Sequence, residues 1–124
     1  MEFADKSKPI YLQIADRICD EITSGTFPPE SRIPSVREYA GILQVNFNTV
    51  MRTFEFLSSK GIIFNKRGVG YFVSPDAHDC IARLREQTFF GDELKYFFSR
   101  LRTIGVSADR LHQLYYNYYQ EHKQ

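Results

Sequence analysis

The sequence predicts a mostly α-helical chain with one small β-hairpin. Two short helix signals lie between residues 34 and 61, and a hairpin signal with a basic, glycine-rich tip follows at residues 62–73. The remaining residues, 76–124, show only helical spacing of their apolar side chains. Helix, turn, helix and hairpin in this order are typical of a winged helix-turn-helix. We therefore expect a winged helix-turn-helix domain at residues 1–75 and a short helical domain at residues 76–124.

The composition allows a folded core and argues against several other classes of protein. Hydrophobic residues make up 43% of the 124 residues, which is enough for a core and argues against disorder. No apolar run is long enough to cross a bilayer, and no secretory signal is evident, so we expect a cytoplasmic protein with no membrane partner. Cys19 and Cys80 lack the spacing of a zinc site or a redox motif, so no metal is predicted.

The distribution of charge is more informative than the formal net charge of +1. From Arg32 to Gly70 the chain carries six basic and two acidic residues, whereas the rest of it carries ten basic and 13 acidic residues. A local excess of positive charge is expected on a surface that binds phosphate groups.

Three helices are predicted before the hairpin. Isoleucines spaced four residues apart form one apolar stripe on a first helix that ends near Gly25. The second helix begins after Ser35, because Ser35 and Glu38 have the spacing of a capping box. Asn46 is the expected cap of the third helix, which ends at Gly61 in a left-handed conformation.

The hairpin and further helices complete the predicted fold. The β-rich segments 62–64 and 71–73 are expected to pair as the two strands of the hairpin. Beyond them, two apolar stripes are interrupted near Gly91, which predicts a break between two helices. Gly105 ends the second of these helices, and Ser107 caps a last one.

The second helix of a helix-turn-helix pair enters the major groove of DNA by its N-terminal end, which here starts at Asn46 or Phe47. Asparagine can pair with adenine through two hydrogen bonds, and an aromatic group can contact the thymine methyl. At the hairpin tip, cations supply charge for phosphates, and glycine allows close approach to a groove. The predicted DNA-binding residues are Ser35, Arg37, Asn46, Phe47, Asn48, Thr49, Arg52, Lys66, Arg67 and Gly68.

Several of these residues also have simpler interpretations. Asn46 alone is more often just a helix cap, a role that is compatible with a phosphate contact. Asn48 and Thr49 are also ordinary residues of a solvated helix surface. An exposed Phe47 is consistent either with a base contact or with packing back against its own helix. The order of the elements, rather than any single residue, therefore carries the prediction.

Aromatic residues gather in the last third of the chain. A tail of two or three helices is too small to bury this apolar area by itself, so we expect a symmetric homodimer. The alternative is that the tail folds back on its own DNA-binding domain. A small-molecule effector is an option that the sequence does not support, since aromatic residues at helical spacing are more often core than pocket. The predicted dimer interface consists of Leu94, Phe97, Phe98, Leu101, Leu114 and Tyr118.

A set of segments along the chain forms a recognisable pattern, namely Pro9–Ile14, Gly25 with Pro28 and Pro29, Ile33–Ala40, Val45–Val50, Gly61–Ile63 and Arg67–Val73. On these segments, residues 9–74 resemble the N-terminal domain of GntR-type bacterial transcription regulators. The short helical tail is similar to that of the YtrA-type subfamily, whose C-terminal domain mainly dimerises. The resemblance implies a homodimeric repressor that binds a palindromic operator in double-stranded DNA and holds no cofactor.

The resemblance also implies roles for individual residues. Arg37 is expected to contact DNA, the start of the recognition helix to contact bases and phosphates, and Gly68 to approach the minor groove. Two positions depart from the family pattern, because many members have arginine where this chain has Phe47 and where it has Met51. Base preference is therefore not transferred at these positions, and Arg52 is the candidate for a phosphate contact in place of residue 51.

Two other classes of function are weighed against this one. An enzyme is not supported, because the three histidines have no metal-binding or triad-like spacing, and Gly68-Val69-Gly70 lacks the third glycine of a dinucleotide fingerprint. We predict no catalytic residue. The other alternative is a winged-helix module that binds protein or RNA without specific DNA binding. The polar pattern that includes Arg37, Asn48 and Arg67 argues against that alternative.

Overall fold

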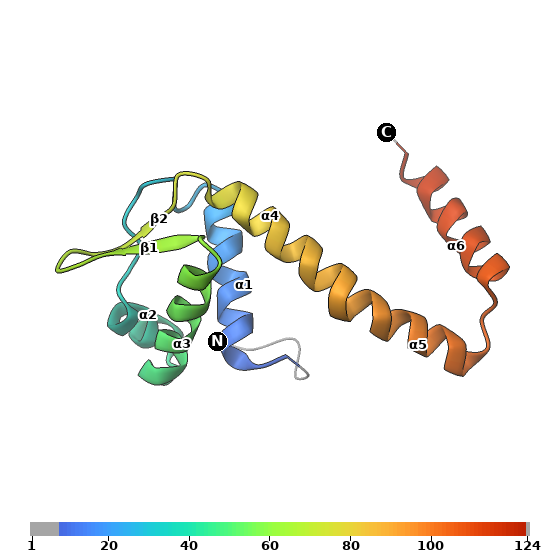
Figure 1. Ribbon diagram of the computed structural model, residues 1–124, viewed down its shortest axis with the longest axis horizontal. Helices are drawn as coiled ribbons and strands as arrows, with labels where there is room; N and C mark the ends of the chain where they lie inside the picture. The colour runs from blue at the N-terminus through green and yellow to red at the C-terminus, as the bar shows by residue number, and fades with distance from the viewer. Residues whose placement is uncertain (1–7, 124) are drawn as a thin grey trace. The chain divides into compact units, whose positions relative to one another are not determined.

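The computed structural model describes residues 8–123, which form three helices, a hairpin and a further run of helices (Figure 1). The predicted fold class, mostly helical with one hairpin, is confirmed. The elements in chain order are α1 (Ile10–Thr23), α2 (Val36–Leu43), α3 (Phe47–Ser59), β1 (Ile63–Lys66), β2 (Gly70–Val73), α4 (Ala77–Thr88), the π-helical turn η1 (Phe89–Glu93), α5 (Leu94–Ile104) and α6 (Ala108–Glu121).

The chain divides by its internal contacts into two compact units, one ending at Leu84 and the other beginning at Arg85. The first part of α4 belongs to the first unit, because Ala77, Cys80 and Ile81 are buried in its core. The predicted domain boundary after residue 75 stays a prediction. No helix within residues 8–123 combines enough length with enough apolar character to span a bilayer.

Local hydrogen bonds define where α2 and α3 begin. The Glu38 N–H donates to Ser35 Oγ at 3.1 Å and the Ser35 N–H donates to Glu38 Oε1 at 3.2 Å, so the predicted capping box is present. The Asn48 N–H donates to Asn46 Oδ1 at 2.7 Å, which confirms Asn46 as the cap of α3. Gly61, which follows the C-cap residue Lys60 of α3, has a φ of 74°, the left-handed conformation that was predicted for it.

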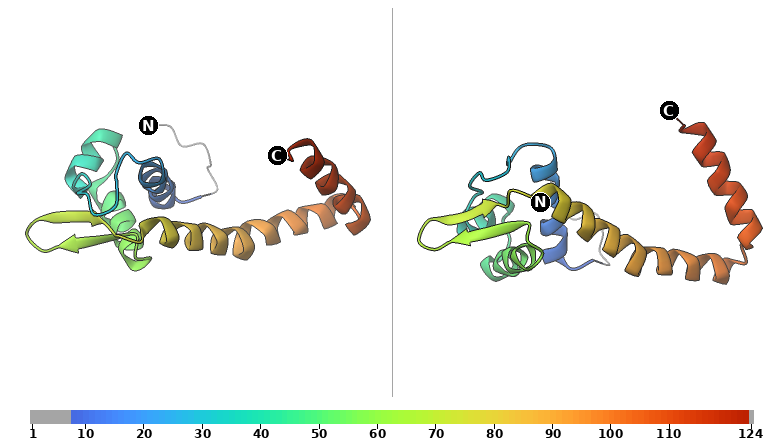
Figure 2. Two further views of the ribbon diagram at one scale, coloured as in Figure 1. Left: turned by 90° about the horizontal axis from the view of Figure 1, so that it is seen from above. Right: turned by 45° about the horizontal axis from the view of Figure 1, so that its top comes forward.

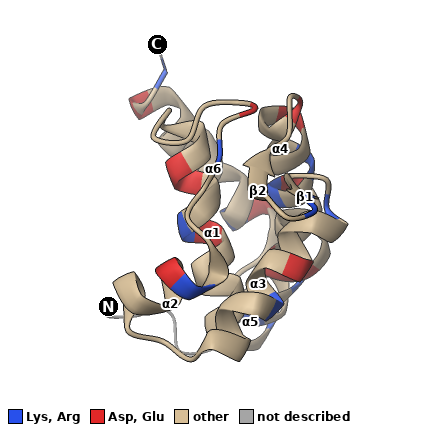
Figure 3. Ribbon diagram, turned by 90° about the vertical axis from the view of Figure 1, so that its left-hand side faces the viewer, with Lys and Arg blue, Asp and Glu red and all other residues tan. Residues whose placement is uncertain are grey.

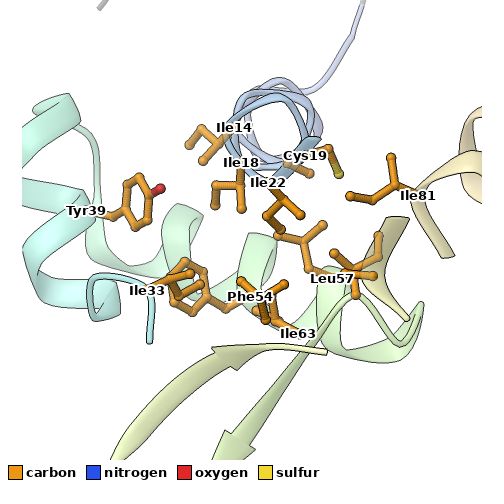
Figure 4. Packing of buried hydrophobic residues seen from close by; sticks show 14 of the residues in the cluster. Ile14, Ile18, Cys19, Ile22, Ile33, Tyr39, Phe54, Leu57, Ile63 and Ile81 are labelled. Carbon is orange, nitrogen blue, oxygen red and sulfur yellow. The ribbon is translucent and has the colours of Figure 1, made fainter. Parts of the chain in front are cut away.

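The core of the first unit lies between the helices and the inner face of the hairpin (Figure 4). Of the predicted isoleucine stripe of α1, Ile14, Ile18 and Ile22 are buried there with Phe54 and Leu57 of α3, whereas Ile10 at the start of the helix is exposed. Burying one such side chain contributes about 1.5–3 kcal/mol to stability. A hydrogen bond also links α3 to α1, because the Thr53 hydroxyl donates to the Tyr11 carbonyl oxygen at 2.7 Å.

A third segment of extended backbone pairs with the two-stranded hairpin. β1 and β2 pair antiparallel, and residues 31–33 run along the other edge of β2. There the Ile33 N–H donates to the Tyr71 carbonyl oxygen at 3.0 Å, and Arg32 pairs with Phe72 as an antiparallel bridge. Both views of Figure 2 show the tip of the hairpin extending away from the helices of this unit. The segment that leads into α2 therefore also supports the base of the hairpin.

The predicted break near Gly91 is wrong, because the chain stays helical from Ala77 to Ile104. The interruption of the apolar stripe is instead a π-helical turn at Phe89–Glu93. Such a turn inserts an extra residue into the α-helical ladder, which displaces a stripe around the helix without ending the helix. The remaining ends agree with the prediction, since Gly105 has a φ of 92° and Ser107 Oγ accepts from the Arg110 N–H at 3.1 Å.

Candidate nucleic-acid interface

The N-terminal end of α3 presents polar side chains and one aromatic side chain to solvent. Asn46, Phe47 and Asn48 are exposed, and Thr49 is half-buried. Phe47 is 43% exposed, makes no ring contact with any residue between 8 and 123, and does not pack against the core cluster. Of the two interpretations of Phe47, packing back against its own unit is therefore the less favoured. The backbone N–H groups of this helix end also favour a negatively charged group.

Arg52 lies one and a half turns further along α3 and is held by α1. Its Cζ atom is 4.0 Å from the centroid of the Tyr11 ring, within the range of a cation–π contact. The Tyr11 ring in turn meets the Phe56 ring edge-on, at a centroid separation of 6.2 Å. Arg52 remains exposed, so this contact orients the guanidinium and leaves it open to solvent.

The start of α2 supplies a second group of polar atoms. Arg37 is exposed at the second position of the helix. The Ser35 hydroxyl accepts a hydrogen bond from the Glu38 N–H as the cap of the helix. The Ser35 N–H and the Ser35 hydroxyl both donate to the Glu38 carboxylate and lower its pKa, and the charge of Arg32 lowers this pKa further. Glu38 is therefore a negatively charged neighbour of Arg37.

The hairpin tip carries the remaining predicted residues. Lys66 Nζ lies 4.4 Å from the centroid of the Phe72 ring, and that ring stacks on Phe64 at 5.8 Å. Arg67 and Gly68 are exposed at the turn, where Gly68 has a φ of 81° that favours glycine. Figure 3 shows the side of the molecule from which the tip projects, with lysine and arginine positions on α2 and on the hairpin in blue. The structure thus brings the cations of α2 and of the hairpin into one unit with the exposed end of α3.

Residues 10–73 match the family described as "Bacterial regulatory proteins, gntR family". This match spans α1 to β2, more than half of the chain. The chain belongs to the GntR family of bacterial regulatory proteins. The predicted family is confirmed, and this GntR protein is a transcription regulator with a winged helix-turn-helix.

Three similar proteins place the regulator within the family. The HTH-type transcriptional repressor YtrA of Bacillus subtilis is 33% identical over 107 residues, which cover 86% of this chain and 82% of YtrA. The crystal structure of a GntR-family regulator from Bacteroides thetaiotaomicron is 49% identical with a TM-score of 0.72, and the match covers 91% of this chain and 98% of that one. The DNA-binding domain of AraR in complex with operator ORE1 is 28% identical with a TM-score of 0.52, over 54% of this chain and 82% of that one.

The six residues predicted to form a dimer interface all lie in the second unit of the regulator. No residue from Arg85 to Lys123 is buried, and α5 and α6 therefore expose most of their apolar side chains. Leu94 and Leu101 are half-buried, whereas the other four are between 46% and 60% exposed, namely Phe97, Phe98, Leu114 and Tyr118.

Arg32 was not among the predicted site residues, although it lies at the base of the hairpin. A Cβ atom added to Gly70 would lie only 2.8 Å from Arg32 Nε, so the guanidinium group extends across the bare backbone of this glycine. The position depends on the pairing of residues 31–33 with β2. This pairing joins segments about 40 residues apart, so no local sequence pattern predicts it.

Proposed function

We propose that this regulator is a homodimeric repressor that binds a palindromic operator in double-stranded DNA, in the cytoplasm. The observation that carries the proposal is the common exposure of the α3 N-terminal end, Arg37 and the hairpin tip in one unit. AraR, whose DNA-binding domain is similar over this unit, is seen in complex with an operator, and the similar YtrA is a repressor.

Each group in this surface has a distinct task in the proposal. Asn48 donates to and accepts from an adenine edge in the major groove, and the N-terminal N–H groups of α3 bind the adjacent phosphate. Arg37 contacts the DNA from α2, either at the backbone or at a guanine edge. Arg67 binds phosphate at the hairpin tip, where Gly68 allows the backbone to approach the minor groove. Base contacts then supply specificity, while phosphate contacts supply affinity.

Dimerisation is assigned to the tail, residues 76–124. The support is the uncovered aromatic surface of α5 and α6, which includes Phe97, Phe98 and Tyr118. Exposed apolar patches larger than those of ordinary monomers mark interaction surfaces. A symmetric partner covers the same surface on both chains and doubles the DNA contact, which matches a palindromic site.

The test begins with selection of bound fragments from sheared genomic DNA of the source bacterium, followed by fluorescence anisotropy on the selected duplex. We expect binding that survives excess non-specific competitor and weakens steeply as salt rises. Asn48→Ala should lose affinity for the selected duplex and keep its affinity for competitor DNA. Lys60→Ala, at the opposite end of α3, is the matched control and should bind like the unaltered protein.

Three results would count against the proposal. Binding that competitor DNA always erases would mean that the protein does not read sequence, as expected for a module that binds protein or RNA. A folded protein that sediments as a monomer at every concentration, and occupies single half-sites, would refute the homodimer. Binding to the operator without loss of transcription from the adjacent promoter would refute repression.

A further inference from the structure

The outer face of the hairpin carries a cation that the proposed DNA contacts do not use. Side chains alternate between the two faces of a strand, and residues directly opposite each other share a face. Phe72 lies opposite Arg32 on one side and opposite Phe64 on the other, and Gly70 lies opposite Lys66. Arg32, Lys66, Phe64, Phe72 and the bare Gly70 therefore occupy one face, while Ile33, Ile63 and Val73 on the other face are buried in the core.

Gly70 opens a space on this face, and Arg32 fills it. Gly70 has a φ of 141°, a backbone conformation that residues other than glycine rarely adopt. Its missing side chain leaves room for the guanidinium group, whose Nε, Nη2 and Cζ atoms would lie 2.8, 3.4 and 3.5 Å from a Cβ atom at that position. The side chain is thus guided along β2 toward the tip end of the hairpin, where Gly70 pairs with Lys66.

The guanidinium group of Arg32 keeps its donors available. Within residues 8–123 it takes part in no ion pair and no side-chain hydrogen bond. Glu38 is a neighbouring carboxylate, but Glu38 Oε1 already accepts from the Ser35 N–H. An exposed arginine presents five N–H donors in a planar fork that matches phosphate oxygens. Arg32 and Lys66 therefore lie on opposite sides of β2, with Gly70 between them, and each carries one positive charge.

We propose that Arg32 is a phosphate-binding residue of the hairpin, which holds the DNA backbone beside the phosphate that the hairpin tip contacts. This inference rests on the proposed DNA binding and adds a residue to it. Arg32 also lies between the hairpin and the start of α2, because residues 31–33 lead into that helix. The Arg32 side chain thereby lies between the two proposed DNA-contacting parts, the start of α2 and the hairpin.

The experiment compares the salt dependence of duplex binding for Arg32→Gln, Arg32→Lys and the control Lys60→Gln. Lys60 is an exposed cation at the far end of α3, about 20 Å from its N-terminus at 1.5 Å per residue. Lys60→Gln removes the same charge from the same unit at a residue that lies outside the hairpin face of Arg32 and Lys66. The measured quantity is the slope of log Kd against log salt concentration, on the selected operator and on competitor duplex. Thermal melting checks that each variant is folded.

We expect Arg32→Gln to reduce the magnitude of this slope by about 0.9 for each bound half-site, the value for one lost phosphate contact. Arg32→Lys keeps the charge and should retain the original slope, as should Lys60→Gln. An unchanged slope in folded Arg32→Gln would overturn the inference and leave the proposed function standing. Equal losses in Arg32→Gln and Lys60→Gln would overturn it too, because the effect would then be one of total charge. If the unaltered protein binds no duplex at any salt concentration, both proposals fail.

Discussion

The exposed ring of Phe47 predicts that the regulator recognises a thymine methyl group in each half of its operator. The ring stands at the first position of α3, where an apolar side chain can meet the C5-methyl of thymine in the major groove. Uracil pairs with adenine as thymine does but lacks this methyl group. Replacing thymine by uracil therefore removes the proposed contact partner and leaves the base-pairing pattern intact.

The size of the effect follows from the exposed area. With 43% of the residue exposed and about 200 Å² for a phenylalanine, about 85 Å² is open to solvent. At about 25 cal/mol per Å², covering half of that area contributes about 1 kcal/mol, so Phe47→Ala should weaken binding about fivefold per half-site. Losing one methyl group costs about 0.8 kcal/mol, or about fourfold, for thymine to uracil.

The assay is anisotropy on a set of operator duplexes in which each thymine is replaced by uracil in turn. One position per half-site should bind the unaltered protein about fourfold more weakly, and the same duplex should show no such loss with Phe47→Ala. Phe47→Leu, which keeps an apolar group, serves as the control and should retain part of the sensitivity. If no uracil duplex binds more weakly, or if Phe47→Ala keeps the full sensitivity, Phe47 does not contact a thymine methyl group.

Three further outcomes test the site, the tail and the capping box. Arg37→Ala should weaken operator binding by about 1–3 kcal/mol while the sedimentation coefficient stays that of the dimer; unchanged affinity would remove Arg37 from the interface. Phe97→Asp should yield folded monomers in sedimentation equilibrium, because the ring is exposed in the single chain but buried in the proposed dimer, whereas Ser99→Asp on the opposite face of α5 should remain dimeric. Glu38 has a pKa below its ordinary value of 4.5, so its stabilising effect is present above pH 4.5 and is lost as the pH falls through the folded-state pKa. The difference in Tm between the unaltered protein and Glu38→Ala should therefore shrink below pH 4.5, and a constant difference would show that the carboxylate charge is irrelevant.

Features encoded by neighbouring residues were predictable from the sequence. Ser35 and Asn46 cap their helices because a short side chain reaches an N–H group only two or three residues away, and such spacings are visible in the chain. The same holds for Gly61, whose left-handed conformation ends α3. The exposed end of α3 followed from its place in the order of elements.

Features that depend on distant contacts were not predictable in this way. The position of Arg32 depends on a bridge to Phe72, and the burial of Thr53 depends on its hydrogen bond to the Tyr11 carbonyl oxygen. The helix through Gly91 was also misjudged, since an interrupted stripe is compatible with either a break or a π-helical turn, and the structure has the turn. For Arg32 and Thr53 the deciding interaction lies outside the window from which local patterns are read, whereas the π-helical turn is local, with the Leu94 N–H donating to the Phe89 carbonyl oxygen.

In the proposed homodimer, the open surface of α5 and α6 ties the lifetime of the chain to its abundance. The stability of an obligate dimer depends on protomer concentration, so a copy that is made when few others are present exposes its tail to proteases. At higher abundance the paired tails protect each other and the protein persists. Once synthesis stops, dilution by growth shifts dimers toward short-lived single chains. For the proposed repressor, the operator is then freed sooner than dilution alone would permit.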